Sequence, residues 1–341
     1  MSKFNFFKIL EKDNKELIHS AFISFLIDTN ENFKYKFLGL EPDSYGTSVL
    51  EKTYTEKKKT KNKLRTRIDI EISSLDGKSF VFIENKFKSF PNQMQLENYD
   101  RVFKSNFTKD VKLKKILFCF DKKLVFFDTA WEIFDYQDLV QFLDNEFDFS
   151  KSGDETLFIS HYYAFLCDYL ADYEKYKADC SPLFKKNTSN DEKFWLRLLN
   201  SQLQLSFSKI HGNMDFTFVS NPGNTSTPLL NIIPAKWEMV TALHLLLQFQ
   251  GNDIKFYIHS TDRDAIQGMI NFCTEKIWDD QIELKKLSNR KSKSCFILKI
   301  KVRQMLGTHF SIEEIFNLIN AFYKNLDKNI IEEYSAPVIE Q

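Results

Sequence analysis

Residues 80–99 read FVFIENKFKSFPNQMQLENY, and this stretch decides the fold. It begins with an apolar run that is typical of a buried strand and continues into the first turns of a helix. Glu84 and Lys86 stand one alternation step apart at the end of the strand, and the helix then carries Gln95 and Tyr99. The residues that lie opposite this strand therefore decide whether its charged end serves the fold alone or a chemical function.

A hairpin places a second carboxylate opposite Glu84. Two apolar-rich strands, predicted at 67–73 and 79–87, flank an Asp-Gly pair at 76–77, which is among the strongest short-range hairpin signals. With that pair at the centre of the turn, the register sets Asp69 directly across from Glu84. Strict alternation then places one set of side chains on a single face of the sheet: Arg67, Asp69, Glu71, Phe82, Glu84 and Lys86.

Two facing carboxylates need a compensating charge. Their Cβ atoms would lie about 5 Å apart, and like charges at that distance destabilise a sheet. A divalent cation between Asp69 and Glu84 would remove the repulsion, because Mg²⁺ binds carboxylate oxygens at about 2.1 Å. The alternative is a solvated sheet face on which Arg67 and Lys86 neutralise the two acids.

Further helices and strands on both sides of the hairpin predict a complete α/β domain. Helices are expected at residues 13–28, 91–104, 136–146 and 156–176, and strands at 48–54, 115–120 and 124–127. The polar segment 180–192 is the best candidate for a domain boundary. We therefore expect one domain over residues 1–178 and a second over residues 190–341.

The second domain is expected to be α/β as well. Helices are expected at residues 194–209, 262–277 and 312–326, and strands near Phe216 and Leu230 and at 237–249, 254–260, 282–287 and 295–302. Its sequence has no GxxxxGK[ST], GxSxG or HExxH motif, and its histidines lack the spacing of metal ligands. Sensing, substrate gripping and oligomerisation are all open as its role.

Composition and charge exclude several classes of protein. The formal net charge is zero, so the chain as a whole has no polycation signal for nucleic acid. The five cysteines lie far apart without CxxC spacing, which argues against a zinc ribbon or a disulfide framework. No apolar run approaches the roughly 20 residues that span a bilayer, and the N-terminus has no signal-peptide pattern. We expect a soluble, cytoplasmic protein without membrane contacts.

Together these residues resemble the PD-(D/E)XK nuclease superfamily. Asp69 followed by Glu84-Asn85-Lys86 is similar to the D…ExK signature of that superfamily. Gln95-Leu96-Glu97-Asn98-Tyr99 is similar to the QxxxY element of its exonuclease-like branch. The resemblance covers about residues 13–145, and it departs from the signature where Ile68, not proline, precedes Asp69.

The resemblance implies a fold, a reaction and a metal. The fold is α/β (α+β), a restriction-endonuclease-like core with a central mixed sheet flanked by helices. The reaction is hydrolysis of phosphodiester bonds in DNA or RNA by a nuclease that depends on Mg²⁺ or Mn²⁺. Asp69, Glu84 and the backbone carbonyl of Asn85 would hold the metal, and Lys86 would position the attacking water or stabilise the developing charge.

Three further site residues have open interpretations. The opening helix, with Glu16, resembles that of an uncharacterised bacterial subfamily and so implies a part for Glu16 in the metal site. Asp13 and Glu16 equally fit a capping box at the start of that helix. Gln95 would bond a catalytic group or a phosphate, whereas Tyr99 would orient Lys86, stack on a base or belong to the core.

A basic run at residues 57–67, KKKTKNKLRTR, also has two interpretations. Either it is a solvated loop, or five of its residues contact phosphates: Lys57, Lys58, Lys59, Arg65 and Arg67. For the chain as a whole, the rival interpretation is a non-catalytic nucleic-acid-binding or regulatory module that retains the nuclease fold. The resemblance further suggests bacterial defence against foreign DNA (antiviral defence), with a homo-oligomer or a defence-system protein as the partner.

Overall fold

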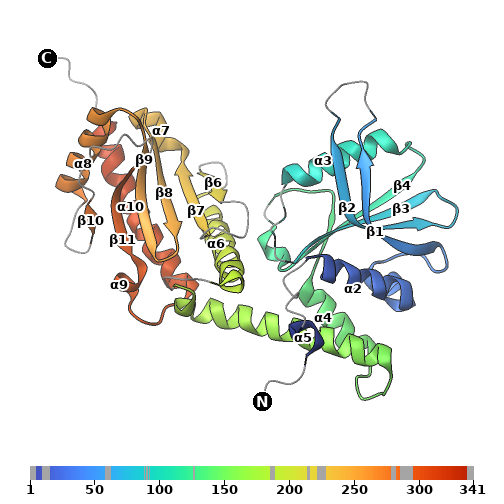
Figure 1. Cartoon of the computed structure of the whole chain (residues 1–341). Helices are drawn as coiled ribbons and strands as arrows, with labels where there is room; N and C mark the ends of the chain where they lie inside the picture. The colour runs from blue at the N-terminus through green and yellow to red at the C-terminus, as the bar shows by residue number, and fades with distance from the viewer. Residues whose placement is uncertain are drawn as a thin grey trace. The chain divides into compact units, whose positions relative to one another are not determined.

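The computed structural model describes most of the chain, which divides into two compact units, Met1–Ala171 and Asp172–Gln341. Each unit has its own sheet and is described by itself (Figure 1). The described residues are 5–9, 16–57, 63–87, 89, 91, 93–125, 127–184, 189–212, 216–220, 228–277, 282–284 and 295–335.

The described part of the first unit is built on a five-stranded mixed sheet of order β1-β2-β3-β4-β5. Its strands are β1 (Tyr45–Thr55), β2 (Arg65–Ser74), β3 (Ser79–Lys86), β4 (Lys112–Cys119) and β5 (Glu132–Asp135). The first three strands form an antiparallel meander, while β4 and β5 add in parallel. This confirms the predicted central mixed sheet. The strand expected at 124–127 is wrong, because residues 122–124 form a 3₁₀ turn and the fifth strand comes later.

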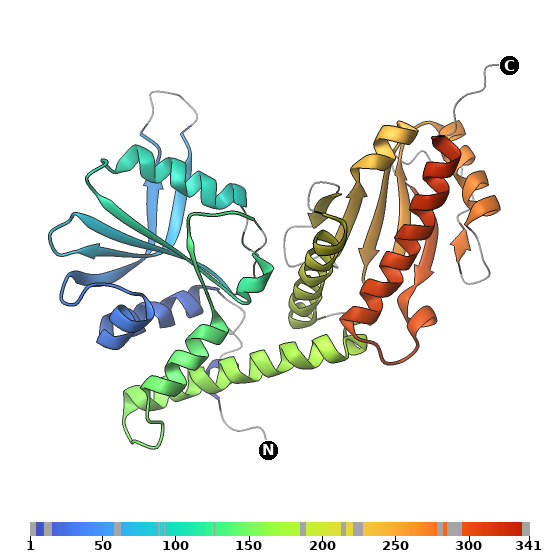
Figure 2. The ribbon, with the colours of Figure 1, turned by 180° about the vertical axis from the view of Figure 1, so that it is seen from behind.

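Helices cover both faces of this sheet. They are α1 (Phe6–Ile9), α2 (Glu16–Thr29), α3 (Gln93–Asn106), α4 (Tyr136–Glu146) and α5 (Asp154–Ala178), whose residues from Asp172 on belong to the second unit, with a π-helical turn at Phe33–Phe37. Figures 1 and 2 show α2 and α3 on opposite faces of the sheet. On the α3 face the rings of Phe82 and Phe103 stack at 4.1 Å. On the other face Phe22 of α2 stacks on Tyr162 of α5 at 3.6 Å. These aromatic contacts fix α3 against strand β3 and join α2 to α5.

The second unit contains an antiparallel sheet of order β10-β11-β9-β8-β7-β6 within the described residues. Helices α6 and α10 lie on one face of it (Figure 2). The elements are α6 (Asn190–His211), β6 (Phe216–Ser220), β7 (Leu229–Pro234), α7 (Ala235–Thr241), β8 (His244–Gln250), β9 (Asp253–His259), α8 (Arg263–Lys276), β10 (Glu283–Leu284), β11 (Cys295–Lys301), α9 (Val302–Leu306) and α10 (Ile312–Tyr334), with a 3₁₀ turn at Ser181–Leu183.

The strand predicted over 237–249 is wrong in its first third. Residues 235–241 form α7 instead, and β8 begins at His244. Ala, Lys, Glu and Met are good helix formers, and Trp237 is fully buried with its Nε1 donating to Asp327 Oδ1 at 2.9 Å. A tertiary contact to α10 therefore outweighs the apolar run that the sequence presents as a strand.

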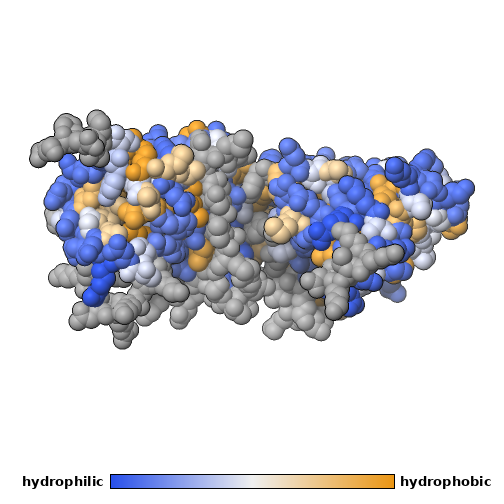
Figure 3. Space-filling model, turned by 90° about the horizontal axis from the view of Figure 1, so that it is seen from above, coloured by the Kyte–Doolittle hydropathy of each residue, from blue (hydrophilic) through white to orange (hydrophobic). Residues whose placement is uncertain are grey.

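Exposed hydrophobic side chains are scattered in the described part of the surface. In the view of Figure 3, hydrophobic residues are interspersed among hydrophilic ones over both units. No helix formed by the described residues combines the length and the apolar composition that crossing a membrane requires.

Candidate functional site

The β2–β3 hairpin has the predicted register. Ile70 pairs with Ile83, and Gly77 in the turn has φ +71°, a left-handed conformation that favours glycine. The Ile70–Ile83 pair is the last of the ladder. Continued by one residue, the same register sets Asp69 against Glu84.

The predicted strict alternation of side chains between the two faces of the sheet, however, is wrong beyond this last pair. Ile68 belongs to the buried cluster around Phe82, on the face that alternation assigns to Asp69. In the neighbouring strand β1, Glu51 lies opposite Asp69 and has φ +56°, which side-chain-bearing residues rarely adopt. Both strands thus leave regular β geometry at this level, and Asp69 Oδ2 accepts a hydrogen bond from the backbone N–H of Asn85 at 2.7 Å.

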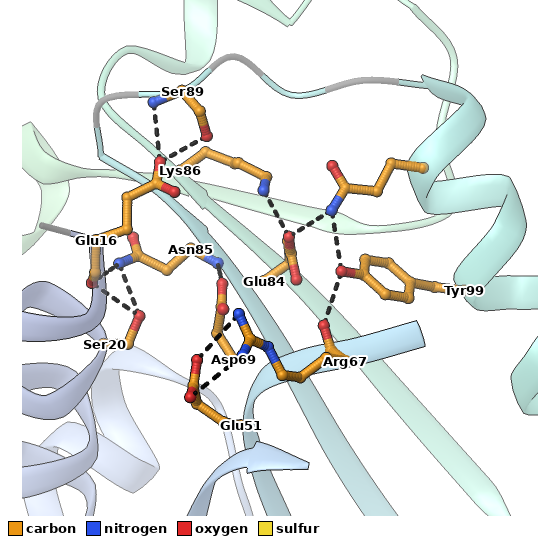
Figure 4. A network of polar contacts seen from close by, with 11 residues as sticks. Glu16, Ser20, Glu51, Arg67, Asp69, Glu84, Asn85, Lys86, Ser89 and Tyr99 are labelled. Carbon is orange, nitrogen blue, oxygen red and sulfur yellow. Dashed lines mark hydrogen bonds and ion pairs between the residues drawn. The ribbon is translucent and has the colours of Figure 1, made fainter. Parts of the chain in front are cut away.

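Glu84 is buried, with 2% exposure, at the centre of a polar network (Figure 4). Its Oε1 accepts hydrogen bonds from Lys86 Nζ at 2.7 Å and from Gln95 Nε2 at 2.9 Å. Its Oε2 is also buried and accepts no hydrogen bond of good geometry, although the Tyr99 hydroxyl interacts with the carboxylate. Burial raises the pKa of Glu84 to about 7, with Lys86 opposing the shift and Asp69 adding to it. A buried, unsatisfied carboxylate oxygen is costly, so it indicates a place for a cation or a donor.

Asp69 and Lys86 complete the charge balance. Burial raises the pKa of Asp69, although the hydrogen bond from Asn85 opposes that rise. Burial lowers the pKa of Lys86, but the carboxylates of Glu84, Glu16 and Asp69 outweigh this effect and raise it above its ordinary value. Lys86 is therefore an ammonium ion at neutral pH, held against the two acids that the hairpin brings together.

Helix α3 places Gln95 and Tyr99 on one face, four residues apart. Gln95 Nε2 donates to Glu84 Oε1 and to Tyr99 Oη, both at 2.9 Å. Tyr99 Oη donates to the backbone carbonyl of Arg67 at 2.9 Å. The expectation that Tyr99 stacks on a base is wrong, because its ring is 4% exposed and packs in the core. Its hydroxyl binds strand β2 rather than Lys86, so Tyr99 holds Gln95 and Gln95 holds Glu84.

Glu16 begins α2 and is directed at the segment that follows β3. Its Oε1 accepts hydrogen bonds from the Ser89 N–H at 2.9 Å and the Ser89 hydroxyl at 2.5 Å. Asp13, its partner in the expected capping box, lies outside the described residues. Among the described residues no three His, Cys, Asp or Glu side chains are placed to hold one metal ion, so the structure does not bring Glu16 to Asp69 and Glu84 as a third ligand.

The predicted phosphate-binding residues lie in β2 and in the segment before it. Residues 58–59 are outside the described part of the chain. Lys57 is exposed and donates from Nζ to a backbone carbonyl at the end of α3. Arg65 is exposed, while Arg67 forms an ion pair with Glu51 at 3.3 Å. Arg67 therefore already has a carboxylate partner, which a phosphate would have to replace.

Two carboxylates and one backbone carbonyl make up the candidate metal centre. Asp69 and Glu84 supply hard oxygen donors, and Glu84 Oε2 is the unsatisfied one. The N–H and C=O of one strand residue point to the same edge of the strand, so the Asn85 carbonyl faces the side of Asp69, which its N–H contacts. This donor set fits Mg²⁺ or Mn²⁺, for which water and substrate oxygens would supply the remaining ligands.

The structure adds three residues to the site that the sequence pattern does not reveal. Glu51 binds Arg67, Ser89 binds Glu16, and Tyr136 donates to Asn85 Oδ1 at 2.7 Å. Each contact joins separate elements, so no local spacing reveals it. The one local signal is that Tyr136 directly follows the end of β5, in the first turn of α4.

One comparison with known proteins gives a match. A family model described as PD-(D/E)XK nuclease superfamily matches residues 4–164. Searches of curated proteins and of solved structures give no match. The matched residues include the whole sheet of the first unit and helices α2 and α3, so the complete candidate site lies inside the match.

Proposed function

We propose that the protein is a Mg²⁺- or Mn²⁺-dependent nuclease acting on DNA or RNA, and the match of residues 4–164 to the model of the PD-(D/E)XK nuclease superfamily supports this proposal. The observation that carries the proposal is the Glu84 carboxylate. One oxygen is held by Lys86 and Gln95, and the other is buried and accepts no hydrogen bond of good geometry. Most buried carboxylate oxygens with a purely structural role are hydrogen-bonded, whereas a metal ligand needs one oxygen that is available.

The residues of the site have separate roles in this proposal. Asp69, Glu84 and the Asn85 carbonyl would hold the metal, which when bound would act as a Lewis acid on the phosphate and lower the pKa of a bound water. Lys86 presents an ammonium group beside Glu84, where it orients the attacking water and stabilises charge that develops on the phosphate oxygens. Gln95 keeps Glu84 Oε1 in place, so that Oε2 would remain available to a metal.

The proposal is tested by incubating the purified chain with single- and double-stranded DNA and RNA in Mg²⁺, in Mn²⁺ and in EDTA. Cleavage that requires metal is the expected result, and the substrates that are cut define the specificity. The rival, a non-catalytic binding module, predicts binding without cleavage under every condition. The intact set of Asp69, Glu84 and Lys86 argues against it.

Metal binding is expected to stabilise the folded wild type. Mn²⁺ at 100 times its dissociation constant should add about 2.7 kcal/mol to the free energy of unfolding. The isosteric variant Asp69→Asn should gain much less, since it lacks one of the two carboxylates. Thermal unfolding with and without Mn²⁺ measures both gains. Equal gains in the two proteins would place the metal elsewhere.

The basic run is expected to bind phosphates without taking part in the chemistry. Replacing Lys57, Lys58 and Lys59 by Gln should weaken duplex binding and flatten its salt dependence by about 0.9 in log–log slope for each phosphate that the variant no longer binds. The cleavage rate of bound substrate should change little, because phosphate contacts position the substrate. Binding isotherms at several salt concentrations decide the matter, and an unaltered slope would favour the solvated loop.

We further propose that the protein acts in the cytoplasm against foreign DNA, either as a homo-oligomer or together with a defence-system partner protein. The resemblance of its opening helix, with Glu16, to that of a bacterial subfamily supports this role. The second unit would then sense the target, grip the substrate or join subunits. Bacteria that express the wild type should resist phage better than bacteria that express Glu84→Gln, and equal plaque counts would contradict the defence role.

A further inference from the structure

From Glu84 to Lys86, strand β3 is paired with a neighbouring strand on one side only. Asn85 pairs with Phe118 of β4, but the ladder to β2 ends before Glu84. In place of a ladder bond, the Asn85 N–H is donated to the Asp69 carboxylate. The strand end that carries the candidate site therefore needs another constraint to hold its backbone and its charged side chains in register.

The Asn85 side chain supplies that constraint. It points away from Glu84, is 0% exposed and has both polar atoms satisfied. Its Nδ2 donates to the Ser20 hydroxyl at 3.1 Å and to the Glu16 carbonyl at 3.3 Å, both in α2 (Figure 4). Its Oδ1 accepts from the hydroxyl of Tyr136, the first residue of α4, at 2.7 Å. Helices α2 and α4 thus both form hydrogen bonds with the Asn85 side-chain amide.

A second set of buried side chains holds the residues that bind the Asn85 amide. The hydroxyls of Tyr136 and Tyr162 interact, and Tyr162 Oη lies 2.7 Å from His19 Nδ1. The His19 ring stacks on Phe87, directly after β3, with centroids 3.6 Å apart. All four side chains are 0% exposed. A buried polar network with its groups satisfied specifies one arrangement of the elements that it joins.

We propose that the Asn85 side chain is a positioning element of the metal centre, an inference that rests on the proposed nuclease function. Tyr136 and Ser20 hold its amide, and the amide holds the backbone whose carbonyl faces the Asp69 side. The same backbone sets the direction in which Glu84 and Lys86 leave the strand. Removing a group that hydrogen-bonds to a metal ligand typically changes the metal affinity 10- to 100-fold. The contribution of the Asn85 side chain should therefore be measurable as a change in metal affinity.

The test uses variants of the full chain that each remove one hydroxyl and open no large cavity. Tyr136→Phe and Ser20→Ala should each weaken Mn²⁺ binding by about 10-fold, measured by calorimetry. The matched control is Tyr54→Phe, because the Tyr54 hydroxyl donates to the buried Glu71 in the same sheet at 2.5 Å. The control should lose stability in EDTA, as the other variants do, yet bind Mn²⁺ like the wild type.

The possible outcomes separate the inference from the function on which it rests. Wild-type Mn²⁺ affinity in both Tyr136→Phe and Ser20→Ala would overturn the positioning role and leave the metal centre standing. A loss in Tyr54→Phe as large as theirs would also overturn it, because general destabilisation would then be the cause. A wild type that binds no Mn²⁺ would overturn both. If Tyr136→Phe does not fold, Ser20→Ala alone provides the test. This variant should fold, because Asn85 Nδ2 still donates a hydrogen bond to the Glu16 carbonyl.

Discussion

Glu84→Gln is expected to abolish metal-dependent cleavage while the chain still folds. Glutamine keeps the size of the side chain and an acceptor for Lys86 and Gln95, but an NH₂ group takes the place of the unsatisfied Oε2 and cannot bind a cation. The loss should exceed that of a supporting residue, so a decrease of at least about 100-fold is expected. Single-turnover cleavage measures it, and far-UV circular dichroism checks the fold.

The same variant has an expected effect on stability without metal. The pKa of Glu84 is about 7 in the folded protein against an ordinary 4.5, so its favourable contribution is complete below pH 4.5 and is lost as the pH rises through 7. Relative to the wild type, Glu84→Gln should therefore gain stability between pH 5 and pH 8, on the order of 2–3 kcal/mol. Urea unfolding in EDTA at the two pH values measures the gain.

A matched control separates this carboxylate from others in the sheet. Glu71 is also buried in β2, but its Oε2 accepts from the Tyr54 hydroxyl outside the candidate centre. Glu71→Gln should keep wild-type cleavage. Wild-type cleavage by Glu84→Gln would mean that the metal is bound elsewhere, whatever the fold of the variant.

The hairpin could be predicted because its signals are local. The Asp-Gly pair at 76–77 is a sequence feature of a tight turn, and a tight turn determines which residues face each other. The register from Ile70 to Ile83 followed directly from it. The positions of α2 and α3 likewise depend on periodic apolar residues, which a single sequence displays, whereas the mixed sheet was expected from the family resemblance.

The remainder of the site depends on contacts that no local pattern records. Glu51 adopts its left-handed conformation opposite Asp69, in another strand, and the packing of Ile68 changes with it. Tyr136 looks like an ordinary helix start, yet it holds Asn85. The strand predicted at Trp237 is wrong for a similar reason. Asp327 in α10, 90 residues further along the chain, accepts a hydrogen bond from Trp237 and holds it in a helix. In each case the deciding contact joins residues that are far apart in the sequence, and local preferences do not record such contacts.

Lys86→Met is expected to reduce cleavage by about 100- to 1,000-fold at neutral pH, the usual effect of losing a group that stabilises charge in the transition state. Two causes contribute. The ammonium no longer acts on the phosphate, and Glu84 loses the neighbour that lowers its pKa. The pKa of Glu84 should then rise above 7, so a larger fraction of Glu84 is protonated at pH 7 and Mg²⁺ binds more weakly.

The pH dependence separates these two causes. Raising the pH to 9 ionises a larger fraction of Glu84 in Lys86→Met, so Mg²⁺ affinity should recover towards the wild-type value while the cleavage rate of the metal-saturated variant stays low. Lys86→Arg keeps the positive charge beside Glu84 and should bind Mg²⁺ normally at pH 7. Calorimetry and single-turnover cleavage between pH 6 and pH 9 give both quantities. Full recovery of the rate at pH 9 would restrict Lys86 to balancing the charge of Glu84, because a group that acts on the phosphate itself cannot be replaced by ionising its neighbour.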